Sequence, residues 1–544
     1  MKRLLAFLAF ALIILSFTLF CIFATEKTDI LGLQRIPFDC EFHHDGDRMT
    51  LLWKPLPYPC FYRVETLVKT TGKIKGEPAY HVMQSTYTMQ NSCDVPTMSI
   101  PTYYQVTAYG MFGRLAGLHA PILSPRFSNP LHPVTILHYG ADHPASLMPY
   151  LVWHSVPDAV CYEVELLSMP PETEGGIEPS PKRRIFCTQD IFTNGYQIDL
   201  RPYLKQNGTL YWRVRGMGFH HEPVGEFCTA EPLVVNTLLP VPDRPMINDF
   251  DCSPDFEQPL YPVYQWIPMH DAAHYEVELM TEPILIRDEN NATPSPHRIW
   301  QQTVAGNAYA CYDEYPRPYA GEYYWRVRAV DAEGKTIGHY SDTKEFIVAG
   351  HAKRIKAAAF GDSITHGGGS LSYSPVNLEF SYQTYLDFPV LNLGKSGDTS
   401  RTTAERFDRD VLPFQPQNLL ILMGSNSLRT TEVSADDIIR DLDSVRRKCI
   451  ANDIRPIFLT LMPINPKHIT SAFGTVTDPD WQKKLTEVNA YIRKQPYHID
   501  LEPHFYDESH SMLDPKFALD GLHPDVMGKM LMAEIINRHA DLLK

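Results

Sequence analysis

The chain has 544 residues, too many for one hydrophobic core, and a scale of about 100–200 residues per domain predicts several domains. A hydrophobic fraction of 44% and a charged fraction of 21% are ordinary for folded protein and argue against long disordered tracts. The formal net charge of -15, with no basic stripe, argues against a nucleic-acid partner, because phosphate binding needs clustered lysine and arginine.

Residues 1–25 resemble an export signal. Lys2 and Arg3 precede an apolar run at 4–24, which ends at a charged segment. The run is longer than the roughly 7–15 residues of a cleaved signal and reaches the roughly 20 that span a bilayer. Cleavage and retention as an N-terminal membrane anchor therefore both stay open. In either case we expect an exported protein that is periplasmic, cell-surface or secreted.

A pattern recurs three times between residues 30 and 349. A tryptophan is followed nine residues later by a tyrosine that opens an alternating run; the pairs are Trp53 and Tyr62, Trp153 and Tyr162, and Trp266 and Tyr275. A second aromatic-rich alternating run closes each unit, at 103–107, 211–215 and 324–328. Alternation with period two is typical of half-buried strands. The units therefore predict β-sandwiches with a tryptophan in each core.

The runs 266–279 and 324–331 resemble fibronectin type III modules. The resemblance implies three all-β fibronectin III/immunoglobulin-like sandwiches, at 30–130, 131–240 and 241–349. Such modules serve as spacers or binding platforms. Because their aromatic residues alternate within strand patterns, we expect these residues to pack in the cores rather than to form a carbohydrate-stacking face.

Cysteines recur with the same repeats. Cys40 and Cys93 flank Trp53 much as Cys252 and Cys311 flank Trp266, and an exported protein meets an oxidising compartment. We therefore predict the disulfides Cys40–Cys93 and Cys252–Cys311, with free buried thiols as the alternative.

After residue 350 the pattern changes to strands that alternate with helices. Short apolar strands are expected at 355–360, 390–393, 419–423, 454–461 and 498–501. Amphipathic helices are expected at 399–411, 435–451, 480–493 and 526–543. This rhythm predicts a domain over 350–544 with a parallel sheet covered by helices on both faces, an α/β/α three-layer fold. The active site of such a sheet lies beyond the C-terminal ends of its strands.

Four polar clusters follow the predicted strands. The first places Ser363 at a strand-to-helix turn, where its hydroxyl projects from the sheet. The second, 392–399, opens a helix whose backbone N–H groups can face an anion, and the third adds the amide of Asn426. The fourth carries Asp520 and His523 on one loop, where the aspartate can orient the imidazole.

The order, spacing and placement of these clusters resemble the four blocks of SGNH (GDSL-type) hydrolases over residues 354–544. The resemblance implies that Ser363 is the nucleophile, His523 the general base and acid, and Asp520 its orienting partner. It also implies an oxyanion hole made by the backbone N–H groups of Ser363 and Gly397 and the side chain of Asn426. No cofactor and no metal are implied.

Three neighbouring residues receive other roles. Ser427 stands where the family often has aspartate, which puts local support or substrate choice in doubt rather than the chemistry. Asp362 is expected to be a structural hydrogen-bonding residue, and Gly394 to serve the turn.

Two rival enzyme classes fit less well. An α/β-hydrolase would carry a Gly-x-Ser-x-Gly elbow, which is missing here, and Asp520 and His523 share one loop. A metal hydrolase is disfavoured because no metal-ligand spacing links His366 and His468, two histidines expected near the site.

The residues specify acyl transfer but not the acyl donor. The family resembled here includes carbohydrate acetylesterases, lipases and thioesterases. Export and the appended β-modules favour O-deacetylation of a polysaccharide or glycan. The alternatives are a lipid or short-acyl esterase of the same mechanism, or a surface glycan-binding protein with a vestigial hydrolase domain. The glycine-rich run 365–370 either leaves room for a bulky substrate or is a mobile loop.

Overall fold

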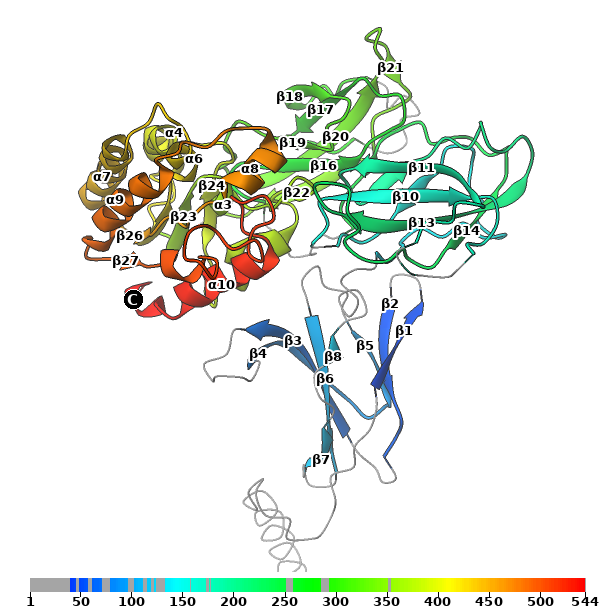
Figure 1. The fold of residues 1–544 in the computed structure, drawn as a ribbon, viewed down its shortest axis with the longest axis horizontal. Coiled ribbons are helices and arrows are strands. Elements are labelled where there is room, and N and C mark those ends of the chain that lie inside the picture. The colour runs from blue at the N-terminus through cyan, green and yellow to red at the C-terminus, as the bar shows by residue number, and fades with distance from the viewer. Residues whose placement is uncertain are drawn as a thin grey trace, which may run out of the picture. The chain divides into compact units, whose positions relative to one another are not determined.

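The computed structural model describes residues 40–543 apart from 46–47, 57–60, 71–78, 96–101, 111–114, 119–121, 124–132, 157, 173–175, 177, 251–257, 285–292 and 351–353. The chain divides into two compact units, Met1–Asn129 and Pro130–Lys544 (Figure 1). The expected signal or anchor at 1–25 lies outside the described residues. Within the described ranges, no helix combines the length and apolar character needed to cross a membrane.

The first unit contains two antiparallel sheets. One has the order β1-β2-β5, with strands Cys40–Asp45, Arg48–Trp53 and Ser92–Val95. The other has the order β4-β3-β6-β7, with strands Ala79–Thr88, Phe61–Thr70, Thr102–Tyr109 and Leu115–Leu118, and β8 (Ile122–Leu123) also pairs with β6. Their shared core holds Trp53, Tyr62 and Tyr104.

Two further all-β regions open the second unit. The first joins β9 (Tyr150–Val152) to β12 (Gly195–Gln197) and has a sheet β11-β10-β13-β14, with strands Arg184–Ile191, Cys161–Leu167, Gly208–Met217 and Glu231–Val235. The next has a sheet β15-β16-β19 at Met246–Ile247, Val263–Ile267 and Ala310–Tyr312. Its second sheet is β18-β17-β20-β21 at Arg298–Ala305, His274–Met280, Gly321–Val330 and Thr336–Ile337, and β22 (Lys344–Val348) pairs with β20.

The nine-residue spacing from tryptophan to tyrosine has the same structural cause in all three repeats. The two rings contact each other in the core, with centroids 5.1 Å apart in the first repeat, 5.3 Å in the second and 5.1 Å in the third. Each tyrosine hydroxyl also accepts a backbone N–H from the intervening segment, at Leu56, Val156 and Met269. The pair therefore ties one sheet to the turn that leads into the next, and core packing is confirmed for these aromatic residues.

The predicted Cys40–Cys93 disulfide is wrong. Cys40 lies opposite Trp53 on β2, and Cys93 lies opposite Leu51 on the other side of the same strand. Two strand spacings of about 4.8 Å separate them, beyond the roughly 7 Å that a disulfide bridges between Cα atoms. Cys93 is accordingly a free thiol.

The predicted Cys252–Cys311 disulfide is also not formed. Cys311 is a free and buried thiol, whereas Cys252 lies outside the described residues. Cys311 pairs with Tyr264, two residues before Trp266, just as Cys93 pairs two residues before Trp53. The cysteines thus occupy equivalent strand positions, as their spacing indicated, without forming the bridges.

The C-terminal part of the chain forms a parallel sheet with the order β24-β23-β25-β26-β27. Its strands are Leu391–Gly394, Ala357–Gly361, Asn418–Leu422, Arg455–Leu459 and His498–Ile499. All five lie within or overlap the predicted ranges, so the parallel α/β domain is confirmed. The chain starts in β23, moves out to the edge at β24 and returns across β23 to β25. In open parallel sheets, ligands bind beyond the carboxyl ends of the strands at such a reversal of strand order.

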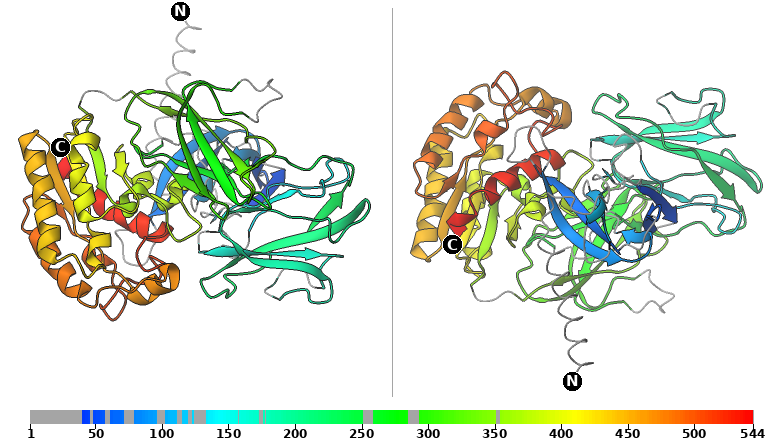
Figure 2. Two further views of the ribbon diagram at one scale, coloured as in Figure 1. Left: turned by 90° about the horizontal axis from the view of Figure 1, so that it is seen from above. Right: turned by 90° about the horizontal axis from the view of Figure 1, so that it is seen from below.

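Helices cover both faces of this sheet. On one face α4 (Ser400–Glu405), α7 (Ala435–Ala451) and α9 (Trp481–Arg493) pack side by side. On the other, α10 (Val526–Asn537) packs against the short 3-10 helices η2 (Leu378–Phe380) and η3 (Tyr382–Tyr385). Figure 2 shows the red α10 across the sheet from the orange helices. Right-handed crossovers account for this distribution.

Candidate active site

Ser363 stands where β23 gives way to α3 (Ser363–His366). Asp362 caps this short helix, because its carboxylate accepts the Ile364 N–H at 3.1 Å, and it also accepts the Ser425 N–H at 3.3 Å. A Cβ on Gly361 would lie 1.9 Å from the Leu422 carbonyl oxygen, so only glycine fits between the two strands. Asp362 is fully buried and holds two strand ends together, which is the structural role expected for it.

Three predicted catalytic residues form one hydrogen-bonded series. The Ser363 Oγ lies 2.8 Å from His523 Nε2, and His523 Nδ1 lies 2.7 Å from Asp520 Oδ2. The second carboxylate oxygen of Asp520 accepts the backbone N–H groups of Leu522 at 2.8 Å and His523 at 2.7 Å. An ionised Asp520 accepts the Nδ1 proton, which leaves the Nε2 lone pair of His523 facing the serine hydroxyl. This is the arrangement that base activation of a serine requires.

Two of the expected oxyanion donors, Gly397 and Asn426, follow the strands β24 and β25. Gly397 adopts φ +85°, a left-handed conformation that suits glycine and turns its backbone away from the preceding strand. Asn426 lies in α6 (Ser425–Leu428), and its side-chain N–H donates to the Asp398 carbonyl at 2.9 Å. One amide proton of Asn426 is used in this bond, and the second is chemically available to a ligand.

Ser427 links α6 to the first turn of α4. Its hydroxyl accepts the Ser400 N–H at 2.9 Å, at the first turn of α4, and Ser400 Oγ in turn donates to Asp441 at 2.6 Å. The short serine thus leaves room for a serine-to-aspartate bridge that reaches α7 from α4.

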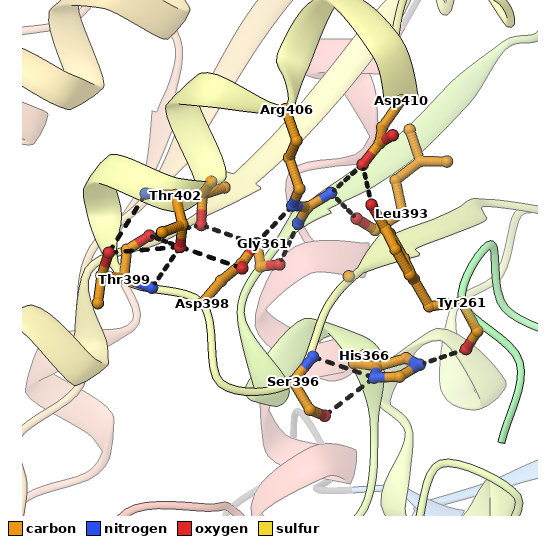
Figure 3. Close-up of polar contacts among 12 residues, drawn as sticks. Tyr261, Gly361, His366, Leu393, Ser396, Asp398, Thr399, Thr402, Arg406 and Asp410 are labelled. Atoms are coloured by element: carbon orange, nitrogen blue, oxygen red, sulfur yellow. Dashed lines mark hydrogen bonds and ion pairs between the residues drawn. The ribbon is translucent and has the colours of Figure 1, made fainter. Parts of the chain in front are cut away.

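Arg406 is a structural residue of the site that the sequence reasoning missed. Its guanidinium is buried and donates to Asp398 at 2.5 Å, to the Leu393 carbonyl at 2.8 Å and to the Gly361 carbonyl at 2.7 Å (Figure 3). It also pairs with Asp410 at 3.0 Å. One cation therefore joins the ends of β23 and β24 to the loop that carries Gly397. Only a buried arginine has enough fixed donors for this.

His366 and His468 lie beside the site, and each has a structural partner. His468 Nδ1 donates to the Leu519 carbonyl at 2.8 Å, next to Asp520. His366 is buried and lies between Ser396 and Tyr261, as Figure 3 shows. Burial lowers the pKa of His366 to about 4, and the Arg406, Lys529 and Lys395 charges act in the same direction. Among the described residues no group of three histidine, cysteine or acidic side chains could hold a metal ion.

A buried lysine lies behind the nucleophile helix. Lys529 on α10 is fully buried, and its Nζ donates to the Ile364 carbonyl at 2.7 Å. Burial lowers the pKa of this lysine to about 7, against the opposing effect of Asp362, Asp525 and Asp520. Burial likewise raises the pKa of the Asp362 carboxyl. No pattern in the sequence indicates the burial of Lys529, because a lysine within a helix normally reaches solvent.

The glycine-rich run after Ser363 is hydrogen-bonded to the segment that follows it. The Gly368 N–H donates to the Phe380 carbonyl at 3.1 Å and the Gly369 N–H to the Tyr373 carbonyl at 3.3 Å. A Cβ on Gly369 would lie 2.3 Å from the Phe380 ring. The glycines therefore allow the chain to fold tightly against Phe380, while room for a bulky substrate beside Ser363 and mobility of this run stay predictions.

A serine, a histidine and an aspartate in series, at the carboxyl edge of a parallel sheet, define a serine hydrolase. Residues 359–530 match the GDSL-like Lipase/Acylhydrolase family model, and the C-terminal domain of the chain belongs to this family. The protein is accordingly a serine ester hydrolase. No curated protein matches the chain.

Solved structures with the same domain cover about a third of the chain. A GDSL-like lipase from Bacteroides thetaiotaomicron is 21% identical, with 35% of this chain and 88% of that chain covered and a TM-score of 0.29. A lipase/acylhydrolase from Enterococcus faecalis is 21% identical, with 35% and 95% covered and a TM-score of 0.28. An acetyl-xylooligosaccharide esterase from Geobacillus is also 21% identical, with 35% and 94% covered and a TM-score of 0.27.

Proposed function

We propose that this protein is an exported esterase that removes O-acetyl groups from a polysaccharide or glycan. The observation that carries ester hydrolysis is the series Ser363, His523 and Asp520, with contacts of 2.8 and 2.7 Å. The predicted export signal at 1–25 and the β-modules that precede the catalytic domain support this substrate class. Their two-sheet architecture supports the fibronectin type III-like assignment.

The reaction follows from the geometry. Ser363 Oγ attacks the ester carbonyl carbon while His523 Nε2 takes the hydroxyl proton, and Asp520 stabilises the imidazolium that forms. The carbonyl oxygen becomes an oxyanion, which Ser363 N–H, Gly397 N–H and the Asn426 amide receive in this proposal. The C–O bond then breaks, and His523 returns the proton to the departing alkoxide. Water repeats the sequence on the acyl-enzyme, which releases the acid and restores Ser363.

The test uses the full chain and a Ser363→Ala variant. We expect hydrolysis of p-nitrophenyl acetate and release of acetate from acetylated xylan or pectin, both lost in the variant by about 10⁴-fold or more. Acetate release from one polymer identifies the substrate class. Turnover of lysophospholipid with no release from any polymer would favour the lipid or short-acyl esterase. Binding of glycan with no turnover of any ester would favour a glycan-binding protein.

A further inference from the structure

A segment of the third β-module is part of the catalytic domain core. Leu260 and Tyr261, just before β16, are buried in the same apolar cluster as the strands of the parallel sheet. The Leu260 N–H donates to the Asn392 carbonyl at 3.0 Å, on the edge strand β24. The module thereby covers an edge of the sheet that would otherwise expose unpaired backbone groups.

Tyr261 contacts Asp410 through its hydroxyl and His366 through its backbone carbonyl, as Figure 3 shows. Its hydroxyl donates to Asp410 at 2.5 Å, and the Arg406 guanidinium lies 5.6 Å from its ring centroid. Its backbone carbonyl accepts a hydrogen bond from His366 Nε2 at 2.8 Å. Asp410 and Arg406 hold the loop at Asp398, so both ends of the tyrosine reach groups that bear on this loop.

His366 links the Tyr261 carbonyl to Ser396, the residue before Gly397. A carbonyl can only accept, so Nε2 carries the imidazole proton, and Nδ1 is free to accept the Ser396 N–H at 3.1 Å and the Ser396 hydroxyl at 2.9 Å. A neutral imidazole with one donor and one acceptor is the form that satisfies both partners. The Ser396 peptide is therefore fixed relative to Tyr261 in the third module.

We propose that His366 and Tyr261 are positioning residues that hold the Gly397 N–H in place for the oxyanion, so that the third β-module is part of the catalytic unit. The proposal rests on the acyl-transfer mechanism above. Neither residue touches the reacting atoms in this assignment. Their effect is on the loop geometry, and it should appear in kcat rather than in KM, because the oxyanion forms only in the transition state.

The experiment compares His366→Leu and His366→Gln in the full chain. Leucine removes both hydrogen bonds, whereas the glutamine amide can accept from Ser396 and donate to Tyr261. We expect His366→Leu to lower kcat for p-nitrophenyl acetate by about 10- to 100-fold, less than the loss of a whole donor, with KM within twofold. His366→Gln should recover most of this loss. Labelling of Ser363 by a fluorophosphonate probe should slow in parallel.

The matched control is His498→Leu, the same change on β27 at the opposite edge of the sheet, where His498 contacts the Gln495 carbonyl. It should keep the wild-type kcat. If His366→Leu fails to fold, Tyr261→Phe replaces it. This change removes only the hydroxyl, which donates to Asp410 and accepts from Arg409, and it should lower kcat by several-fold.

Three outcomes would overturn the proposal. The first is a kcat within twofold of wild type in a folded His366→Leu or, where that variant does not fold, in Tyr261→Phe. The second is a loss in His366→Gln equal to that in His366→Leu, and the third is an equal loss in His498→Leu. A wild-type chain that neither turns over an ester nor labels at Ser363 would instead refute the esterase function itself. Inactivity on acetylated polymers alone, with p-nitrophenyl acetate still hydrolysed, would argue against the proposed substrate class and would not affect the test of His366.

Discussion

His523 contacts Ser363 directly and His366 ends the short helix that Ser363 begins, and each has partners on both ring nitrogens. His523 has a side chain that is 17% exposed, a carboxylate on Nδ1 and the nucleophile on Nε2. His366 is 2% exposed, with a backbone carbonyl on Nε2 and a backbone N–H on Nδ1. This difference in partners distinguishes His523, which can act as a base, from His366, which connects two backbone segments. An imidazole that must gain a proton needs an anion behind it, whereas an imidazole between two peptide groups is stable only when it stays neutral.

The largest loss of activity is expected on substitution of Asp520, the carboxylate partner of His523. Asp520→Asn keeps the shape of the side chain but presents an amide to His523, which favours the wrong tautomer and removes the charge that stabilises the imidazolium. We expect kcat for p-nitrophenyl acetate to fall by about 10⁴-fold, as when the aspartate of a serine triad is replaced by asparagine. His366 has no carboxylate partner, so no equivalent loss exists on its side. A fall of less than tenfold would remove Asp520 from the mechanism.

The second largest loss is expected on removal of a proposed oxyanion donor, the Asn426 side chain. Asn426→Ala removes one predicted oxyanion donor and also the bond to the Asp398 carbonyl. We expect turnover to slow by about 100- to 1000-fold, or about 2.7–4 kcal/mol in the barrier, with little change in KM. Steady-state kinetics on p-nitrophenyl acetate measures this split. A near-normal kcat would show that the amide plays no part in the transition state.

The neutral state of His366 predicts an acid-sensitive fold. Its pKa of about 4 is below the ordinary value near 6.5, so between these values the unfolded chain binds a proton that the folded chain does not. The stability is present above pH 6.5 and is lost as the pH falls toward 4, by about 3 kcal/mol for a full 2.5-unit difference. Thermal unfolding between pH 4.5 and 7.5 should show a shallower pH dependence in His366→Gln than in wild type. Parallel curves for the two proteins would contradict this assignment.

The sequence predicted what depends on local pattern. Strand periodicity located the parallel sheet, and the strand-end position of Ser363 and the loop before the last helix that carries His523 pointed to one edge of the sheet, where the two side chains meet. Contacts between distant segments left no such signal. Tyr261 is 105 residues before His366 and reaches it through a backbone carbonyl, which any residue possesses. The Cys40–Cys93 bridge failed for the related reason that spacing along the chain does not show which strand lies between two cysteines.

The buried charge pairs in the β-modules are a second kind of contact between distant segments that the local pattern did not predict. The Glu165 carboxylate lies 2.8 Å from Arg213 on the facing strand, and Glu278 lies 2.7 Å from Arg326 in the next module. The alternating runs identified both strands but not the register that places these residues opposite each other. Charged residues in an alternating strand are expected on the solvent side. Here other parts of the modules cover that side, including the Tyr340 ring over Arg326.

The smallest effect on kcat is expected for Ser427→Ala, next to Asn426 in α6. Ser427→Ala leaves the buried Ser400 N–H without its acceptor but leaves the Asn426 amide in place. An unsatisfied buried N–H costs about 1–3 kcal/mol, so we expect a lower thermal unfolding midpoint and a kcat reduced far less than in Asn426→Ala. Differential scanning fluorimetry and steady-state kinetics on the two variants separate these effects. A kcat loss as large as that of Asn426→Ala would mean that the anchoring of α4 contributes as much to the oxyanion hole as the donor itself.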